Sequence, residues 1–242
     1  MTANLQRKIG FYEKYVKRVL DIICAAAAII VFCWLYAIIA LAIRIKLGGP
    51  VLFKQPRPGK IDKKTGQERI FYMYKFRTMT EEKDRDGNLL PDEERMTKLG
   101  AFLRKTSLDE LPEAFNILCG DMSVVGPRPQ LVRDMTFMSE RHRMRHTARP
   151  GLSGLAQING RNAITWDEKL EWDLRYIEKV SFGGDLKIVL QTIKKAFFDR
   201  DGIGNDESGV SEDYGDYLLR LGRISEQEYE EKQKDAVAIL SV

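Results

Sequence analysis

The chain has 242 residues, 44% of them hydrophobic, and a formal net charge of +4. This length suits one domain of ordinary size or a domain with appendages, and the hydrophobic content excludes an intrinsically disordered chain. The charge is uneven: residues 201–242 carry eleven acids and four bases, so the first 200 residues carry a net charge of +11. A basic body of this kind favours an anionic partner, such as a nucleic acid, an anionic membrane surface or a phosphorylated substrate.

An uncharged apolar run follows a basic amphipathic segment near the start of the chain. The run extends over twenty-two residues from Ile22 to Ile43. As a helix it would be about 33 Å long, close to the thickness of a bilayer core. It is apolar on every face, which favours membrane insertion over a buried core helix.

The charged residues on both sides of the apolar run indicate how it would sit in a membrane. They are basic on both sides, and no acid occurs between Asp21 and Asp62. The positive-inside rule then places both ends in the cytoplasm, as a re-entrant helical hairpin would require. Such a hairpin needs a break in mid-helix, yet the middle, Phe32-Cys33-Trp34-Leu35, contains no proline or glycine. A straight single span therefore stays open as the alternative.

Two strand candidates follow the apolar run, over residues 51–53 and 70–77. Pro56-Arg57-Pro58-Gly59 is expected to form a turn, and the two strands would pair as a small β-hairpin. Side chains alternate along a strand, so Lys75 and Arg77 would share one face and could clamp a phosphate. A solvated strand face is the simpler alternative for these two cations. Residues 80–97 are highly charged and predict a surface loop.

Two adjacent carboxylates, Asp109 and Glu110, occur at a predicted helix start. Ser107 and Glu110 fit a capping box, which is the simpler explanation of the pair. Pro112 lacks an N–H group, so regular helix would begin near it and leave the two acids in an exposed, less regular first turn. Carboxylates can also act as nucleophiles toward phosphorus, with Mg²⁺ neutralising the phosphates. The basic body and the apolar run make this second function the stronger hypothesis.

The second half of the chain is rich in arginine. Seven arginines stand against two acids between residues 126 and 166, and two prolines fix the backbone around Arg128. Arginine binds phosphate oxygens in a bidentate manner, so the cluster suits phosphate recognition. Residues 185–198 predict a basic amphipathic helix, either at a membrane interface or packed on the core. The acidic segment from Asp201 either folds back on the basic body or binds a partner.

Six motifs then occur in the order of a known family. They are Lys17-Arg18-Val19-Leu20-Asp21 with the apolar run; Gly49-Pro50-Val51-Leu52-Phe53-Lys54-Gln55-Pro56-Arg57-Pro58-Gly59; Lys75-Phe76-Arg77-Thr78-Met79; Leu103-Arg104-Lys105-Thr106-Ser107-Leu108-Asp109-Glu110-Leu111-Pro112; Val125-Gly126-Pro127-Arg128-Pro129; and Arg149-Pro150-Gly151 through Asn159-Gly160-Arg161. Over roughly residues 12–200 the chain resembles the bacterial sugar transferases, which are monotopic polyprenyl-phosphate phosphoglycosyltransferases. The family's mid-helix Ser-Pro pair is replaced here by Cys33-Trp34.

The resemblance implies transfer of a sugar 1-phosphate from a UDP-sugar to undecaprenyl phosphate, with release of UMP and with Mg²⁺ as cofactor. Asp109 would attack the β-phosphate and form a covalent phosphosugar intermediate. Glu110 would bind the metal together with Asp109 or assist proton transfer. The other residues carried over are Lys75, Arg77, Arg104 and Arg161 for phosphates, Asn162 for substrate, Pro127, Arg128 and Pro129 for the nucleotide side, and Asp185, which matches a family acid.

We therefore expect an α+β, predominantly helical fold with an N-terminal membrane-embedded re-entrant helix, a small β-hairpin and interfacial amphipathic helices. Residues 1–47 would be membrane-associated, 48–200 a catalytic domain on the cytoplasmic face of the bacterial inner membrane, and 201–242 an acidic extension. Membrane lipids are expected partners, a homodimer is left open, and nucleic acid is not expected, because the arginines are scattered. The alternative is a non-catalytic membrane-anchored protein that binds anionic lipids.

Overall fold

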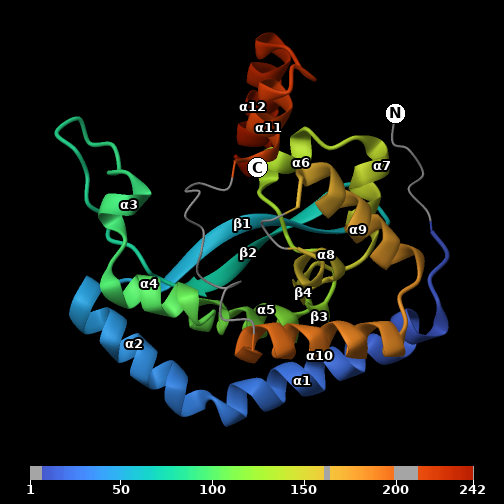
Figure 1. The fold of residues 1–242 in the computed structure, drawn as a ribbon, viewed down its shortest axis with the longest axis horizontal. Coiled ribbons are helices and arrows are strands. Elements are labelled where there is room, and N and C mark those ends of the chain that lie inside the picture. The colour runs from blue at the N-terminus through green and yellow to red at the C-terminus, as the bar shows by residue number, and fades with distance from the viewer. Residues whose placement is uncertain (1–6, 161–163, 199–211, 242) are drawn as a thin grey trace.

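The computed structural model describes residues 7–160, 164–198 and 212–241, and Figure 1 shows a mainly helical molecule built around one long hairpin. Strands β1 (Leu52–Ile61) and β2 (Glu68–Phe76) pair antiparallel, and the short strands β3 (Ser123–Val125) and β4 (Gly151–Ser153) pair in parallel. The predicted α+β class with a small hairpin is confirmed. The hairpin is longer than expected, because residues 56–59 continue β1 instead of forming a turn. Both strands of a two-stranded ribbon are edges, where proline is tolerated.

The apolar run forms two helices that meet at a bend. A short π-helical turn (Tyr12–Val16) leads into α1 (Lys17–Val31), and α2 (Cys33–Leu47) follows after Phe32. The two arms are bent by 62°. None of the described helices alone is long and apolar enough to cross a membrane, whereas the bent pair together passes that test of length and composition. The predicted mid-helix break is present without proline or glycine.

Different parts of the body hold the two arms of the bend. On α1, the buried Asp21 accepts hydrogen bonds from the Ser123 hydroxyl and the Val124 N–H, both at 2.9 Å. On α2, the Tyr36 hydroxyl donates to the Leu111 carbonyl at 2.6 Å. Ile43 of α2 is fully buried in a cluster with the hairpin and α4. These tertiary contacts account for the angle that the local sequence does not explain.

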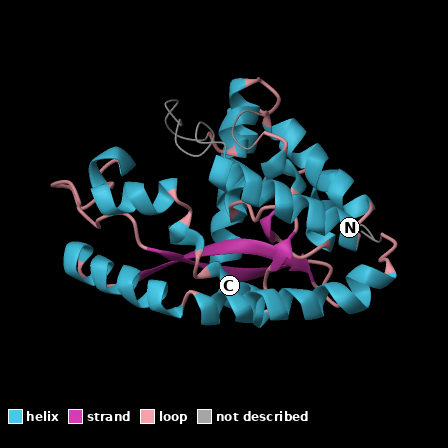
Figure 2. Ribbon diagram, turned by 60° about the horizontal axis from the view of Figure 1, so that its bottom comes forward, coloured by secondary structure: helices cyan, strands magenta, loops and turns pink. Residues whose placement is uncertain are grey.

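Most of the remaining helices are short, and they pack around the hairpin and the bent pair in Figures 1 and 2. They are α3 (Asp92–Arg95), α4 (Lys98–Lys105), η2 (Leu108–Glu110), α5 (Glu113–Cys119), α6 (Val132–Thr136), α7 (Glu140–Arg143), η3 (Met144–Thr147), α8 (Leu155–Ile158), α9 (Trp166–Glu178), α10 (Phe182–Phe198), α11 (Tyr214–Arg220) and α12 (Glu226–Leu240).

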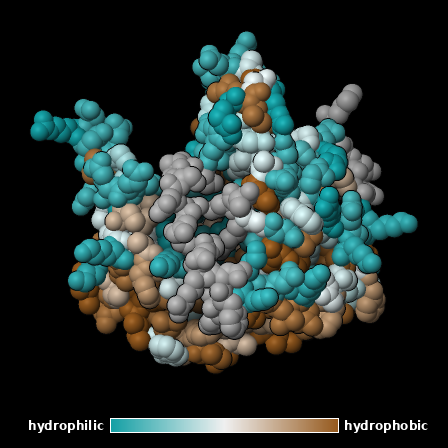
Figure 3. All heavy atoms as spheres, in the orientation of Figure 1, coloured by the Kyte–Doolittle hydropathy of each residue, from teal (hydrophilic) through white to brown (hydrophobic). Residues whose placement is uncertain are grey.

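Helix α10 lies beside α1, and the two helices with α2 form one layer of the molecule. Large apolar side chains are exposed along this layer, among them Ile30, Trp34 and Leu41 of the bent pair and Leu186 and Leu190 of α10. Figure 3 shows the resulting apolar band along the lower edge of the view. An exposed apolar surface of this extent is typical of a protein or membrane contact.

Candidate active site

The adjacent acids lie in a tight turn between two helices. Asp109 and Glu110 belong to the 3₁₀ turn η2, and α5 begins at Glu113 directly after Pro112. Regular helix thus begins directly after Pro112, as the sequence predicted. The capping box is not formed, because Ser107 adopts a left-handed conformation (φ 55°, ψ 19°) and its side chain makes no capping bond. A non-glycine residue with positive φ is strained, and such residues gather at functional sites.

Both acids are less exposed than the sequence indicated. Asp109 keeps 8% of its surface exposed, and Glu110 is partly buried. The expectation of an exposed first turn is therefore wrong. Lys75 of β2 and Arg128 of the Pro-Arg-Pro turn reach Glu110 from segments distant in sequence, and they cover it.

Glu110 has two cationic partners. Its Oε1 accepts hydrogen bonds from Lys75 Nζ and from the Arg128 guanidinium, each at 2.7 Å. Burial opposes ionisation of Glu110, but the charges of Arg128 and Lys75 outweigh that cost and hold its pKa well below the usual range. Glu110 is therefore ionised at neutral pH and is compensated by two cations.

Asp109 differs from its neighbour because its carboxylate is unpaired. Among the described residues, no side chain donates a hydrogen bond to it or forms an ion pair with it. Burial raises the pKa of Asp109, and the nearby charges of Lys75 and Arg104 partly oppose that rise. A carboxylate without a bound cation keeps its lone pairs available for attack on an electrophile.

A third carboxylate, Glu113, joins the pair, and the sequence analysis assigned it no role. It is 2% exposed, and its Oε1 lies 3.5 Å from Lys75 Nζ. Burial and the charge of Glu110 raise the pKa of Glu113 to about 7. Its position at i+3 from Glu110 on a helical turn was the available signal, since residues at that spacing are neighbours.

The cations expected beside the acids have separate partners. Lys75 contacts Glu110, as described, whereas the buried Arg77 donates to the Gly49 carbonyl at 3.0 Å and to the Leu47 carbonyl at the end of α2. Lys75 and Arg77 thus contact different groups of the protein, and binding of one phosphate by both stays a prediction. Arg104 is exposed and donates to the Thr78 hydroxyl at 3.1 Å. Substrate binding by Arg77 and Arg104 stays a prediction.

Hydrogen bonds from Arg145 and Gly151 hold the backbone of the Pro127–Pro129 turn. The fully buried Arg145 donates to the Arg128 carbonyl at 2.6 Å and forms an ion pair with the buried Asp173, also at 2.6 Å. The Gly151 N–H donates to the Pro127 carbonyl at 2.9 Å. These bonds hold the backbone of Arg128 while its guanidinium contacts Glu110.

Asp185 lies in a separate cluster. It accepts hydrogen bonds from Lys17 at 2.5 Å and from the hydroxyls of Tyr12 and Tyr176 at 2.9 Å each. It thereby joins α10 to the start of α1 and to α9, and within the described part of the chain no hydrogen bond or ion pair links it to Asp109. The predicted site residues Arg161 and Asn162 lie outside the described residues.

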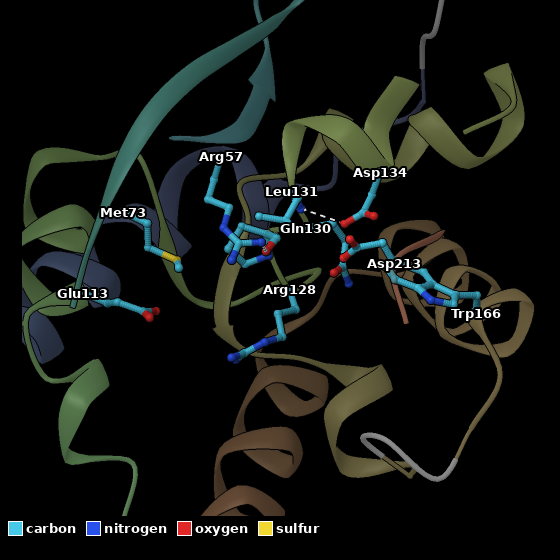
Figure 4. Close-up of a pocket in the computed structure, with 10 residues that line it drawn as sticks. Arg57, Met73, Glu113, Arg128, Gln130, Leu131, Asp134, Trp166 and Asp213 are labelled. Carbon is cyan, nitrogen blue, oxygen red and sulfur yellow. Dashed lines mark hydrogen bonds between the residues drawn. The ribbon is translucent and has the colours of Figure 1, made fainter. Parts of the chain in front are cut away.

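Arg128 lines two cavities. One, of about 250 Å³, is polar and is lined by residues that Figure 4 draws: Arg57, Met73, Glu113, Arg128, Pro129, Gln130, Leu131, Asp134, Trp166 and Asp213. The other, of about 440 Å³, is mainly apolar and extends from Phe32 at the bend to Glu110 and Arg128. The two cavities therefore share Arg128, whose guanidinium contacts Glu110.

A metal ion would find an incomplete ligand set in the protein. The described residues contain no group of three or more His, Cys, Asp or Glu side chains that could hold a metal. Mg²⁺, however, is commonly bound through one or two carboxylates together with substrate phosphates. The unpaired carboxylate of Asp109 beside Glu110 fits that pattern.

Known proteins match this chain over most of its length. The family model described as bacterial sugar transferase matches residues 12–199. A Bacillus subtilis protein named "Uncharacterized sugar transferase EpsL" is 49% identical over 74% of this chain and 86% of its own length. Proteins named UDP-glucose:undecaprenyl-phosphate glucose-1-phosphate transferase are similar too. The one from Klebsiella pneumoniae is 39% identical over 76% of this chain, and the one from Caulobacter vibrioides is 38% identical over 73%.

The chain spans 40% of the Klebsiella protein and 68% of the Caulobacter protein. The matched region contains both adjacent acids, the hairpin and the Pro-Arg-Pro turn. The family resemblance carried by the motifs is thereby confirmed, and the chain belongs to the bacterial sugar transferase family.

Proposed function

We propose that the chain transfers a sugar 1-phosphate from a UDP-sugar to undecaprenyl phosphate and releases UMP. The observation that carries the proposal is the contrast between adjacent acids. Glu110 is bound by Lys75 and Arg128, whereas Asp109 has no cationic partner within the described structure. Relatives whose names state this class of donor and acceptor support the assignment.

In the first step, an oxygen of the Asp109 carboxylate attacks the β-phosphorus of the donor. The bridging bond between the β-phosphorus and the α-phosphate oxygen breaks, and UMP leaves with that electron pair. Asp109 then carries the sugar 1-phosphate as an acyl phosphate. In the second step, a phosphate oxygen of undecaprenyl phosphate attacks the same phosphorus, and the bond to Asp109 breaks.

The cations around Asp109 favour this attack of an anion on an anion. Lys75 and Arg128 already lie next to the acids, and Arg104 lies on the solvent side. Fixed cations that face the developing charge are worth more in a partly buried site than in water. Mg²⁺ held by Asp109, Glu110 and the donor phosphates would supply further neutralisation of the phosphate charge.

The apolar cavity suits the lipid acceptor. It extends from Ala28 and Phe32 at the bend to Glu110 and Arg128, with Val189 and Ile193 of α10 on another wall. A polyprenyl chain could lie along the apolar wall while its phosphate reaches Arg128. We further propose that the bent pair enters the cytoplasmic leaflet of the bacterial inner membrane as a re-entrant hairpin, since its exposed side chains are apolar.

The test is UMP release from a panel of UDP-sugars with undecaprenyl phosphate present. The unaltered chain is expected to release UMP from at least one donor, and Asp109→Asn is expected to lower that rate by at least about a thousandfold, because the nucleophile is lost. Asp86→Asn, in the charged surface loop, is the matched control and should keep the full rate. Equal rates in Asp109→Asn and Asp86→Asn would contradict the mechanism and favour the lipid-binding alternative.

A further inference from the structure

The acidic segment after residue 211 docks on the body at defined contacts. The Trp166 indole N–H donates to the Glu212 carbonyl at 2.9 Å, and the Tyr214 N–H donates to Asp134 at 3.0 Å. The rings of Trp166 and Tyr214 lie 5.1 Å apart. Tyr214 and Leu218 are buried with Trp166 in one apolar cluster. This segment lies beyond residues 12–199, which the family model matches.

The docking brings Asp213 to the wall of the polar cavity. In Figure 4, Asp213, Asp134 and Trp166 lie at one end, Arg57 and Arg128 project into the middle, and Glu113 lies at the other end. Asp213 forms an ion pair with Arg133, which does not line the cavity. The C-terminal segment thus contributes one wall of a cavity that is also lined by Arg128, the partner of Glu110.

Two buried polar atoms of this cavity have no hydrogen-bond partner among the described residues. They are the Nε atom of Arg57 and the Oε1 atom of Glu113, whose nearest cation is Lys75 Nζ at 3.5 Å. Arg57 donates only to the Pro129 carbonyl at 3.2 Å and to Gln55 at 2.6 Å, and no described carboxylate forms an ion pair with it. Buried donors and acceptors without partners are costly, which points to a ligand that both donates and accepts.

Sugar hydroxyls have that chemistry, because each can donate one hydrogen bond and accept others. The carboxylates of Asp213 and Glu113 would accept hydrogen bonds from sugar hydroxyls. The Arg57 guanidinium would donate hydrogen bonds to the oxygens of the same hydroxyls. The volume of about 250 Å³ is below the range for drug-sized ligands and suits one ring of a nucleotide sugar. A donor whose β-phosphate lies at Asp109 would extend past Arg128 into this cavity.

We propose that this cavity binds a hydroxyl-bearing ring of the donor, the hexose or the ribose, and that the C-terminal segment supplies Asp213 as a residue that sets donor affinity. The proposal rests on the proposed function and adds the binding site that selects the donor. It assigns the acidic extension a role in substrate recognition.

The test compares Asp213→Asn with two controls in the full chain. Glu212→Gln alters the neighbouring side chain, which pairs with Arg220 outside the cavity. Arg133→Gln breaks the same ion pair as Asp213→Asn but leaves the cavity wall intact. Asp213→Asn is expected to raise the donor KM, and the Kd of the UDP-sugar by calorimetry, about tenfold, as loss of one charged hydrogen bond predicts. Both controls should stay within about twofold.

UMP distinguishes the two rings. A parallel rise of the Kd of UMP by calorimetry in Asp213→Asn would assign the ribose to this cavity, and an unchanged Kd of UMP would assign the hexose. Arg57→Gln probes the opposite wall and should also raise the donor Kd.

The proposal is overturned if Asp213→Asn and Arg57→Gln both bind donor and UMP within twofold of the unaltered chain, or if Arg133→Gln weakens donor binding as much as Asp213→Asn. Calorimetry needs no turnover, so failure of UMP release with every donor would count against the proposed function alone.

Discussion

Three carboxylates lie within five positions of the chain. Their surroundings differ, and so their pKa values are shifted to different extents and in different directions. Glu110 is ionised because Arg128 and Lys75 bind it. Glu113 is buried beside that negative charge, and its pKa rises to about 7. Asp109 has a raised pKa from burial and no paired cation. Groups whose pKa values are pushed apart in this way take different chemical roles. The sequence predicted which residue types form the site but not how they pair. The ion pairs of Glu110 join it to Arg128, 18 residues away, and to Lys75, 35 residues away, and no local pattern specifies such contacts.

Glu113 makes stability depend on pH. Its folded pKa of about 7 lies above the ordinary glutamate pKa of 4.5, so between those values the folded state retains a proton that the unfolded state has released. The stability contributed by Glu113 is therefore fully present below about pH 4.5 and is lost as pH rises through about 7. Glu113→Gln is expected to flatten the fall of Tm across that window and to raise Tm by a few degrees near pH 8.

Thermal unfolding across a pH series measures this effect. Glu110→Gln is a second probe, because it removes the negative charge that helps to raise the pKa of Glu113, and the fall of Tm should then end at lower pH. Parallel Tm curves for Glu113→Gln and the unaltered chain would show that Glu113 is not the titrating group.

At the scale of elements, the bend at Phe32 explains why part of the fold escaped prediction. Composition identified the apolar run, and charge identified its two basic flanks, but neither specified an angle. The break usually supplied by proline is here held by contacts such as Tyr36 to Leu111, 75 residues apart. The strand pattern likewise found the hairpin but ended β1 too early. Prolines that usually indicate a turn are tolerated in a two-stranded ribbon, because both of its strands are edges.

The re-entrant topology predicts that both ends of the bent pair lie on the same side of the membrane. Lys8→Cys and Lys54→Cys, at exposed positions on either side of the pair, provide the probes in a background with Cys24, Cys33 and Cys119 changed to serine. An impermeant maleimide should label neither position in intact spheroplasts and both after lysis. Labelling of one position alone in intact spheroplasts would indicate a straight span.

At the scale of the whole molecule, the apolar layer of α1, α2 and α10 lies on one side, and the polar cavity lies nearer the docked C-terminal segment. Arg128 lines both the polar and the apolar cavity. A soluble donor and a lipid acceptor could thus approach the same acids from different directions. The opposite charges of body and tail predicted an attraction, and Arg133 with Asp213 is one instance of it. The contacts of Trp166 with Glu212 and Tyr214 could not be predicted, because no local pattern encodes them.

The central claim is that Asp109 carries the phosphosugar. The most direct measurement is mass spectrometry of the chain after incubation with an active UDP-sugar and Mg²⁺, without undecaprenyl phosphate, followed by acid quench and peptide mapping. We expect one added sugar phosphate on Asp109, which is absent from Asp109→Asn and is discharged when undecaprenyl phosphate is added. An unmodified Asp109 in a preparation that releases UMP under the same conditions, or the adduct on another residue, would contradict it.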